Sequence, residues 1–223
     1  MEVTKSEDVT SRKSDASDCG IKGDDVLQGV KCTVTPWSSN IPVPQNLGVN
    51  CSVRVDWLTT HCFSGQNLIS ILVADIVIDY DLLAQTCQEL VFPTDPTELE
   101  LVLLEFERNI GQFIERLSYN LVLDFYRFSV PYLQDVSVVV TKVSSSCFQF
   151  CWIPPSDPTE LFGPTKVYCN NDICCFQSRN YCTSGNGSPI IIENLAWSTG
   201  SSCEDLDSNN PVTSCYHDCD IIF

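Results

Sequence analysis

The amino-acid sequence predicts an α+β fold in which a mainly antiparallel β-sheet carries one long helix. Residues 31–83 contain alternating and β-branched stretches that are typical of strands. Residues 97–129 repeat apolar side chains at helical spacing. Beyond residue 154, short strand patterns are combined with half of the fourteen cysteines in the chain. This last observation adds a disulfide-rich β region at the C-terminus.

Three stretches before the helix have strand patterns. KCTVTPW at 31–37 is short, and NCSVRVDWLTT at 50–60 alternates apolar with polar side chains. LISILVADIVIDYDLL at 68–83 is long and mostly apolar, which predicts a strand covered on both faces. Its acids, Asp75, Asp79 and Asp81, fall on alternate positions. Such spacing suits a glycosidase carboxylate pair, but we interpret these acids as marking the end of the buried strand.

The helix at 97–129 is the clearest single element of the sequence. Thr97 is a good N-cap, and Glu100 three residues later completes a capping box. Gly111 marks a position where the helix can kink or break in two, and Pro131 ends it. The apolar stripe is wide, so we expect the helix to pack against the sheet, with packing against another chain as an alternative.

After the helix, residues 135–155 predict a hairpin that turns at Ser144–Ser146. Short strands are then predicted within 163–171, 173–177 and 188–197. The whole pattern divides the chain into three parts. These are a flexible N-terminal arm at 1–29, an α+β core domain at 30–153, and a cysteine-rich β region at 154–223.

The fourteen cysteines favour a disulfide framework over a zinc site or a catalytic thiol. The sequence contains no C-x2-C pair, and a single reactive thiol would leave its thirteen companions unexplained. In a strand, Cys147 and Cys151 lie about 13 Å apart, too far for a mutual bond. Adjacent Cys174 and Cys175 point to opposite faces and should bind two different neighbours. The disulfide candidates are Cys147, Cys151, Cys169, Cys174, Cys175, Cys182, Cys203, Cys215 and Cys219.

Calcium is the one cofactor that the sequence suggests. Asp205, Asp207 and Asn209 take positions 1, 3 and 5 of a calcium-binding loop. The match fails at position 6, where Asn210 replaces glycine, and at position 12, where Tyr216 replaces glutamate. We therefore favour a solvated acidic turn. The sequence shows no catalytic constellation.

Charge and hydropathy exclude several partners. The chain has 12 basic and 29 acidic residues, so its net charge of −17 disfavours nucleic acid. No apolar run reaches the length of a membrane span, so membrane insertion is not expected. The N-terminus lacks the apolar middle of a secretory signal. Because disulfides require export, we expect the leader to be absent or already removed.

These observations favour a non-enzymatic structural or binding protein at the cell exterior or cell envelope. We expect it to be a subunit of a larger assembly, whose partners are other protein subunits, including copies of itself. Two alternatives stay open. One is a secreted hydrolase whose site is assembled from distant acids. The other is an intracellular virion or complex component with reduced or metal-bound cysteines.

Overall fold

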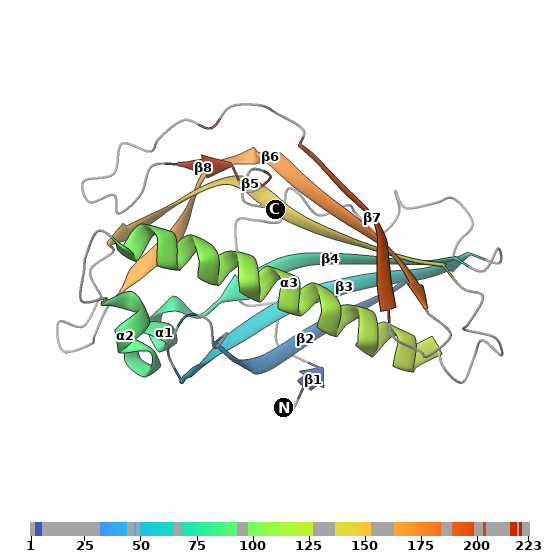
Figure 1. Ribbon diagram of the computed structural model, residues 1–223, viewed down its shortest axis with the longest axis horizontal. Helices are drawn as coiled ribbons and strands as arrows, with labels where there is room; N and C mark the ends of the chain where they lie inside the picture. The colour runs from blue at the N-terminus through green and yellow to red at the C-terminus, as the bar shows by residue number, and fades with distance from the viewer. Residues whose placement is uncertain are drawn as a thin grey trace.

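A computed structural model of the chain describes residues 3–5, 32–43, 47, 50–64, 68–92, 98–126, 137–152, 163–183, 189–198, 203, 215–217 and 219. It confirms the α+β fold: strands form one mixed, mainly antiparallel sheet, and one long helix packs against it (Figure 1). The elements are β1 (Val3–Lys5), β2 (Cys32–Pro42), β3 (Ser52–Ser64), β4 (Leu68–Ile78), α1 (Tyr80–Thr86), α2 (Gln88–Val91), α3 (Leu99–Tyr126), β5 (Ser137–Trp152), β6 (Pro164–Thr183), β7 (Pro189–Ser198) and β8 (Tyr216–His217).

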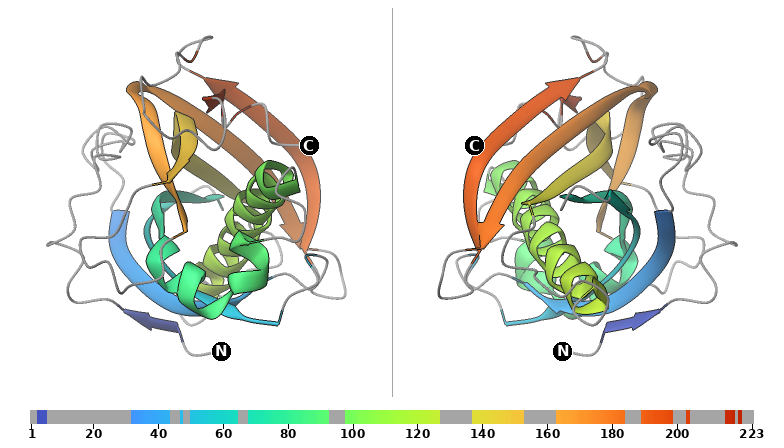
Figure 2. Two further views of the ribbon diagram at one scale, coloured as in Figure 1. Left: turned by 90° about the vertical axis from the view of Figure 1, so that its left-hand side faces the viewer. Right: turned by 90° about the vertical axis from the view of Figure 1, so that its right-hand side faces the viewer.

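The sheet follows the order β1-β2-β3-β4-β5-β6-β7, and β8 pairs with β5 away from this path. All pairs are antiparallel except β4 and β5, which run parallel. The helices α1 to α3 form the crossover that a parallel pair requires. Figure 2 shows the sheet curving around α3, which lies in its concave side.

The hydrophobic core lies between α3 and the concave face of the sheet. Phe106 and Ile110 of α3 are fully buried together with Trp57 of β3 and Phe148 and Phe150 of β5. Burying a side chain of this size contributes about 1.5 to 3 kcal/mol. A buried hydrogen bond also crosses this layer, because Trp57 Nε1 donates to Ser118 Oγ at 3.0 Å. The periodic apolar face that predicted the helix is therefore its core face.

The helix α3 runs as one continuous element through Gly111. A Cβ atom at Gly111 would lie 3.3 Å from Nζ of Lys142 on β5. Glycine thus serves close approach of the helix to the sheet rather than a break in the helix. The predicted N-cap Thr97 and the predicted stop Pro131 lie outside the described residues.

The predicted hairpin at residues 135–155 is wrong, because β5 continues from Ser137 through Trp152. Its pairing with β6 shifts register between Ser145 and Cys147 and again before Phe148. The serine run that resembles a turn thus coincides with a β-bulge, which bends a strand without reversing it. The two short strands predicted within 163–177 are likewise one strand, β6.

The long strand predicted at residues 68–83 ends earlier, at Ile78. Asp79 is the N-cap of α1, because its Oδ1 accepts a hydrogen bond from the backbone N–H of Leu82 at 2.9 Å. Asp81 stands in the first turn of that helix. The three acids therefore do not share a strand, because an aspartate followed by good helix formers begins a helix.

Disulfides join described residues in both halves of the chain. The pairs are Cys32–Cys62, Cys51–Cys87, Cys147–Cys203, Cys169–Cys215 and Cys175–Cys219. Cys174 is disulfide-bonded as well. Cys151 instead carries a buried thiol, toward which Gln149 Nε2 points at 3.1 Å. The side chain of Cys182 lies outside the described residues.

The predicted three-part division stays a prediction. Of the arm at 1–29, only Val3–Lys5 are described, and they pair with β2. The sheet continues across the predicted boundary at residues 153 and 154, because β6 pairs with β5. No helix in the described part of the chain combines the length and apolar character needed to cross a membrane.

Candidate functional site

The strand β4 changes its geometry at Asp75. The pair Ala74–Leu58 is followed by the pair Val77–Asp56, so β4 contains one more residue than β3 over this interval. Asp75 has a φ of 50°, in the left-handed region that aspartate tolerates better than most residues. This is a β-bulge, and a bulge bends its strand and re-aims the side chains beyond it.

The pairing of β4 with β5 ends just before this bulge. Residues Leu68–Val73 pair in parallel with Ser137–Lys142, and no further pair of these two strands follows. Burial changes at the same place. Side chains alternate between buried and half-buried up to Val73, whereas the four residues Asp75–Ile78 are all half-buried. Beyond the bulge, β4 has therefore left the regular one-sided packing of the sheet.

The same bend leaves an edge of β4 open. The backbone N–H of Asp79 donates to the Arg54 carbonyl of β3 at 3.1 Å. Because backbone groups alternate in direction along a strand, those of Ile78 point away from β3. No described residue pairs with β4 on that side between Ala74 and Ile78. We call this segment the open edge.

A pocket of about 270 Å³ lies beside the open edge. The end of β4, the start of α1 and the first part of β6 line it. Its residues are Ile76, Val77, Ile78, Asp79, Tyr80, Asp81, Thr165, Lys166 and Tyr168. Pockets for drug-sized ligands are generally larger, about 300 to 1,000 Å³. The volume therefore suits one large side chain better than a whole cofactor.

A buried polar cluster supports one wall of the pocket. Glu107 of α3 accepts a hydrogen bond from the Tyr80 hydroxyl and binds Lys166 Nζ through Oε2 at 2.9 Å. The Lys166 and Glu107 side chains are only 14% and 13% exposed. Lys166 Nζ also lies 4.1 Å from the centre of the Phe148 ring, within cation–π range. The cluster joins α1, α3 and β6 around the pocket.

This cluster is suited to holding the pocket in shape. Glu107 supplies a counter-charge for the Lys166 ammonium group. Burial, followed by the charge of Glu107, raises the pKa of Tyr80 well above its ordinary value. Tyr80 therefore stays a hydrogen-bond donor at neutral pH and does not act as a base.

Two carboxylates stand on the α1 side of the pocket. Asp79 uses one oxygen to cap α1, and Asp81 is exposed on the first turn. Neither forms an ion pair with a described lysine or arginine. Because Glu107 balances Lys166, the described charged side chains that line this pocket give it a net negative charge.

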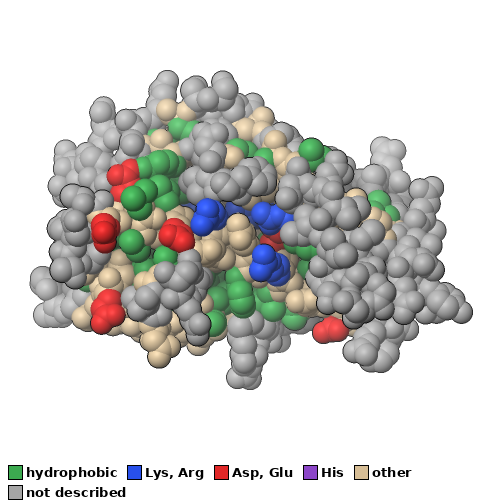
Figure 3. Space-filling view, viewed as in Figure 1, with side chains coloured by type: hydrophobic (Ala, Val, Ile, Leu, Met, Phe, Trp, Pro, Cys, Tyr) green, Lys and Arg blue, Asp and Glu red, His purple; other side chains and the backbone are tan. Residues whose placement is uncertain are grey.

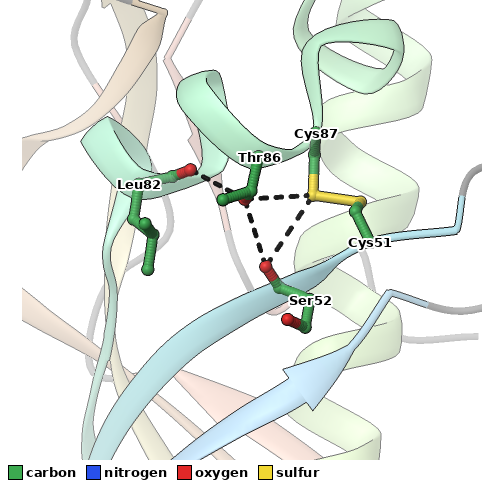
Figure 4. The surroundings of a disulfide bond; sticks show 5 residues. All are labelled: Cys51, Ser52, Leu82, Thr86 and Cys87. Carbon is green, nitrogen blue, oxygen red and sulfur yellow. Dashed lines mark hydrogen bonds between the residues drawn. A yellow bond between two sulfur atoms is a disulfide. The ribbon is translucent and has the colours of Figure 1, made fainter.

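A disulfide fixes the far end of α1. Cys87 at the C-cap is bonded to Cys51, just before β3 (Figure 4). Beside it, the Thr86 hydroxyl lies 2.8 Å from the Leu82 carbonyl and 3.2 Å from the Ser52 carbonyl. The helix is thus held at its start by the Asp79 cap and at its end by a covalent bond. This arrangement makes the α1 side of the pocket rigid.

A second polar cluster lies further along α3, away from the pocket residues. Glu115 is fully buried, forms an ion pair with Arg179 and accepts a hydrogen bond from the Tyr181 hydroxyl at 2.7 Å. Burial raises the pKa of Glu115, while Tyr181 and Arg179 oppose that shift. On the face in Figure 3, Lys and Arg side chains gather near the middle, whereas Asp and Glu lie mostly toward the α1–α2 end. We interpret the cluster of Glu115, Arg179 and Tyr181 as a link between α3 and β6.

The sequence-predicted site residues lie elsewhere or outside the described part. Asp205, Asp207 and Asn209 are not described, so the calcium loop stays a prediction. None of the candidate cysteines lines the pocket. Sequence reasoning missed Lys166 and Tyr168, which looked like ordinary strand residues. The one available signal was the acidic interruption of an apolar strand at Asp75.

The chain was compared with known protein families, curated proteins and solved structures. The chain matches no protein-family model, no curated protein and no solved structure.

Proposed function

We propose that this chain is an exported, non-enzymatic binding protein that recognises another polypeptide at the pocket beside β4. One observation carries the proposal: an open strand edge and a pocket of side-chain size are built from the same residues, Ile76–Ile78. An exposed edge accepts an extended chain by backbone hydrogen bonds, and an adjacent pocket selects a side chain of that chain.

The disulfides support export. The five bonds between described cysteines close segments of 30 to 56 residues and involve both halves of the chain. Disulfides of this density are typical of proteins that fold in oxidising compartments. Bonds that close such segments typically contribute about 2 to 4 kcal/mol each. We therefore propose a place at the cell exterior or envelope, as a subunit that binds other protein subunits.

The rigidity of the site supports recognition. A bulge, an aspartate N-cap, a disulfide and the Glu107 cluster hold the surroundings of the open edge in place. Binding to a preorganised site loses less conformational entropy than binding to a loose one. A weakly held edge would instead pair with any strand and promote aggregation.

The test is selection of binding peptides from a random linear library displayed on phage, using the oxidised full-length chain as the target. Hydrogen–deuterium exchange then maps where the selected peptides bind. We expect peptides that slow exchange in Ala74–Ile78 and in Thr165–Tyr168 together, and not in β2. Selected peptides that protect only other segments, or a selection that yields no binder, would contradict the proposal.

A further inference from the structure

We infer that the polypeptide bound at the open edge is an extended segment that places a lysine or arginine side chain in the pocket. The inference rests on the proposed function and adds the chemistry of the partner. Three properties of the pocket support it: its charge, its lining and its position beside the backbone of β4.

The charge of the pocket favours a cation. Asp79 and Asp81 are carboxylates without an ion pair to any described lysine or arginine. The one cation among the described lining residues, Lys166, already faces Glu107 at 2.9 Å. An incoming carboxylate would meet two like charges, whereas an ammonium or guanidinium group would be attracted to both carboxylates. The net charge of −17 attracts the same class of partner at long range.

The lining of the pocket fits the stem of a long basic side chain. Ile76, Val77 and Ile78 offer apolar surface for methylene groups, and Tyr168 offers an aromatic ring. Lysine and arginine place an apolar stem against such surface while their charged end reaches polar groups. The volume of about 270 Å³ is sufficient for one such side chain.

The position of the pocket couples side-chain recognition to strand pairing. Ile76–Ile78 belong both to the open edge and to the pocket wall. A segment paired with this edge places alternate side chains on the two faces of the sheet. One of them therefore comes next to the pocket. A free amine or a metal cation would use the carboxylates but would leave the open edge unpaired.

The test uses two labelled peptides, Ser-Thr-Val-Lys-Val-Thr-Ser and its counterpart with a central glutamine. Binding to the oxidised full-length chain is measured by fluorescence anisotropy, and hydrogen–deuterium exchange locates it. We expect the lysine peptide to bind about fivefold more tightly than the glutamine peptide, as for one favourable ion pair. We also expect it to slow exchange at Ala74–Ile78.

Variants separate the pocket from the overall charge. The double change Asp79→Asn and Asp81→Asn should abolish the preference for lysine, while asparagine at residue 79 keeps the helix cap. The control Asp124→Asn removes one exposed carboxylate at the far end of α3 and should keep the preference.

The outcomes distinguish the two proposals. If both peptides bind equally and protect Ala74–Ile78, the inference of a basic side chain fails and the proposed function stands. If a lysine preference persists in the double variant, it arises from overall charge, and the inference fails. If neither peptide protects the open edge, the inference fails, and the library selection decides the proposed function.

Discussion

The two halves of β4 have similar composition and different environments. Leu68–Val73 pairs on both sides, and alternate side chains are fully buried. Beyond Asp75, Ile76–Ile78 are just as apolar, yet β3 is their only described pairing partner and their side chains are half-buried. The change from a strand paired on both sides to an open edge thus coincides with one residue in a left-handed conformation, Asp75.

The length and the neighbours of the open edge explain why it does not cause aggregation. An open apolar edge invites aggregation, which short edges and charged neighbours suppress. Here the open edge is short, and Asp75 and Asp79 flank it. Asp75 is half-buried, and this burial raises the pKa of its carboxyl group.

The largest expected effect is a difference in unfolding free energy between alanine variants of two isoleucines, one on each side of the bulge. Ile71→Ala should lower the free energy of unfolding by about 3 to 4 kcal/mol, because Ile71 is fully buried. Ile76→Ala should lower it by about 1 kcal/mol, because Ile76 is half-buried. Urea denaturation of both variants measures the difference. Equal losses would show that the two halves are packed alike.

The next effect concerns the cluster that supports the pocket. Glu107→Leu removes the counter-charge of Lys166 and the acceptor of Tyr80, and should cost about 2 to 3 kcal/mol of unfolding free energy. The matched control is Glu105→Gln, whose ion pair with Arg108 spans 3.8 Å between side chains 42% and 39% exposed. That change should cost less than about 0.5 kcal/mol. If both variants lost the same unfolding free energy in denaturant titrations, the Glu107 cluster would have no special role in stability.

A smaller effect tests the bulge itself. Asp75→Val places a β-branched residue at a φ of 50° and should cost about 1 to 2 kcal/mol. Asp75→Gly adopts that conformation without strain and should stay within about 0.5 kcal/mol of the wild type. Thermal unfolding of the two variants ranks them. A valine variant as stable as the glycine variant would mean that the bulge does not depend on residue 75.

The smallest expected effect is a pH dependence at the second cluster of α3. Burial raises the pKa of Glu115 above its ordinary value of 4.5. Such a carboxyl binds its proton more tightly in the folded chain. Its contribution to stability is therefore full below pH 4.5 and is lost as the pH rises through the folded pKa. Relative to wild type, Glu115→Gln should gain unfolding free energy between acidic and neutral pH. A constant difference between the two proteins in urea titrations would contradict the shift.

Much of the fold was predictable from periodicity. The apolar spacing of Leu103, Phe106 and Ile110 predicted α3 because the same face is buried against the sheet. The hairpin at Ser144–Ser146 failed because a serine run suits a bulge as well as a turn, and only pairing with β6 decides between them. Tertiary pairing of this kind has no local signature.

The candidate site was much less predictable. Asp75 stood out as an acid within an apolar run, but its left-handed backbone depends on the pairing with β3. Lys166 is about 85 residues beyond Tyr80, and α3 brings them together through Glu107. A pocket formed by contacts this distant in the chain cannot be derived from local pattern. The nine candidate cysteines, in contrast, stood out from their density alone.

The most direct test of the account is hydrogen–deuterium exchange of β4, resolved to single amides, in the oxidised chain without any ligand. We expect slow exchange at the amides of Leu68–Val73, which pair with β3 and β5, and fast exchange at the Ile78 amide, which points away from β3. Equal protection of both halves of β4 would show that the edge beyond Asp75 is already covered, and would contradict a binding site there.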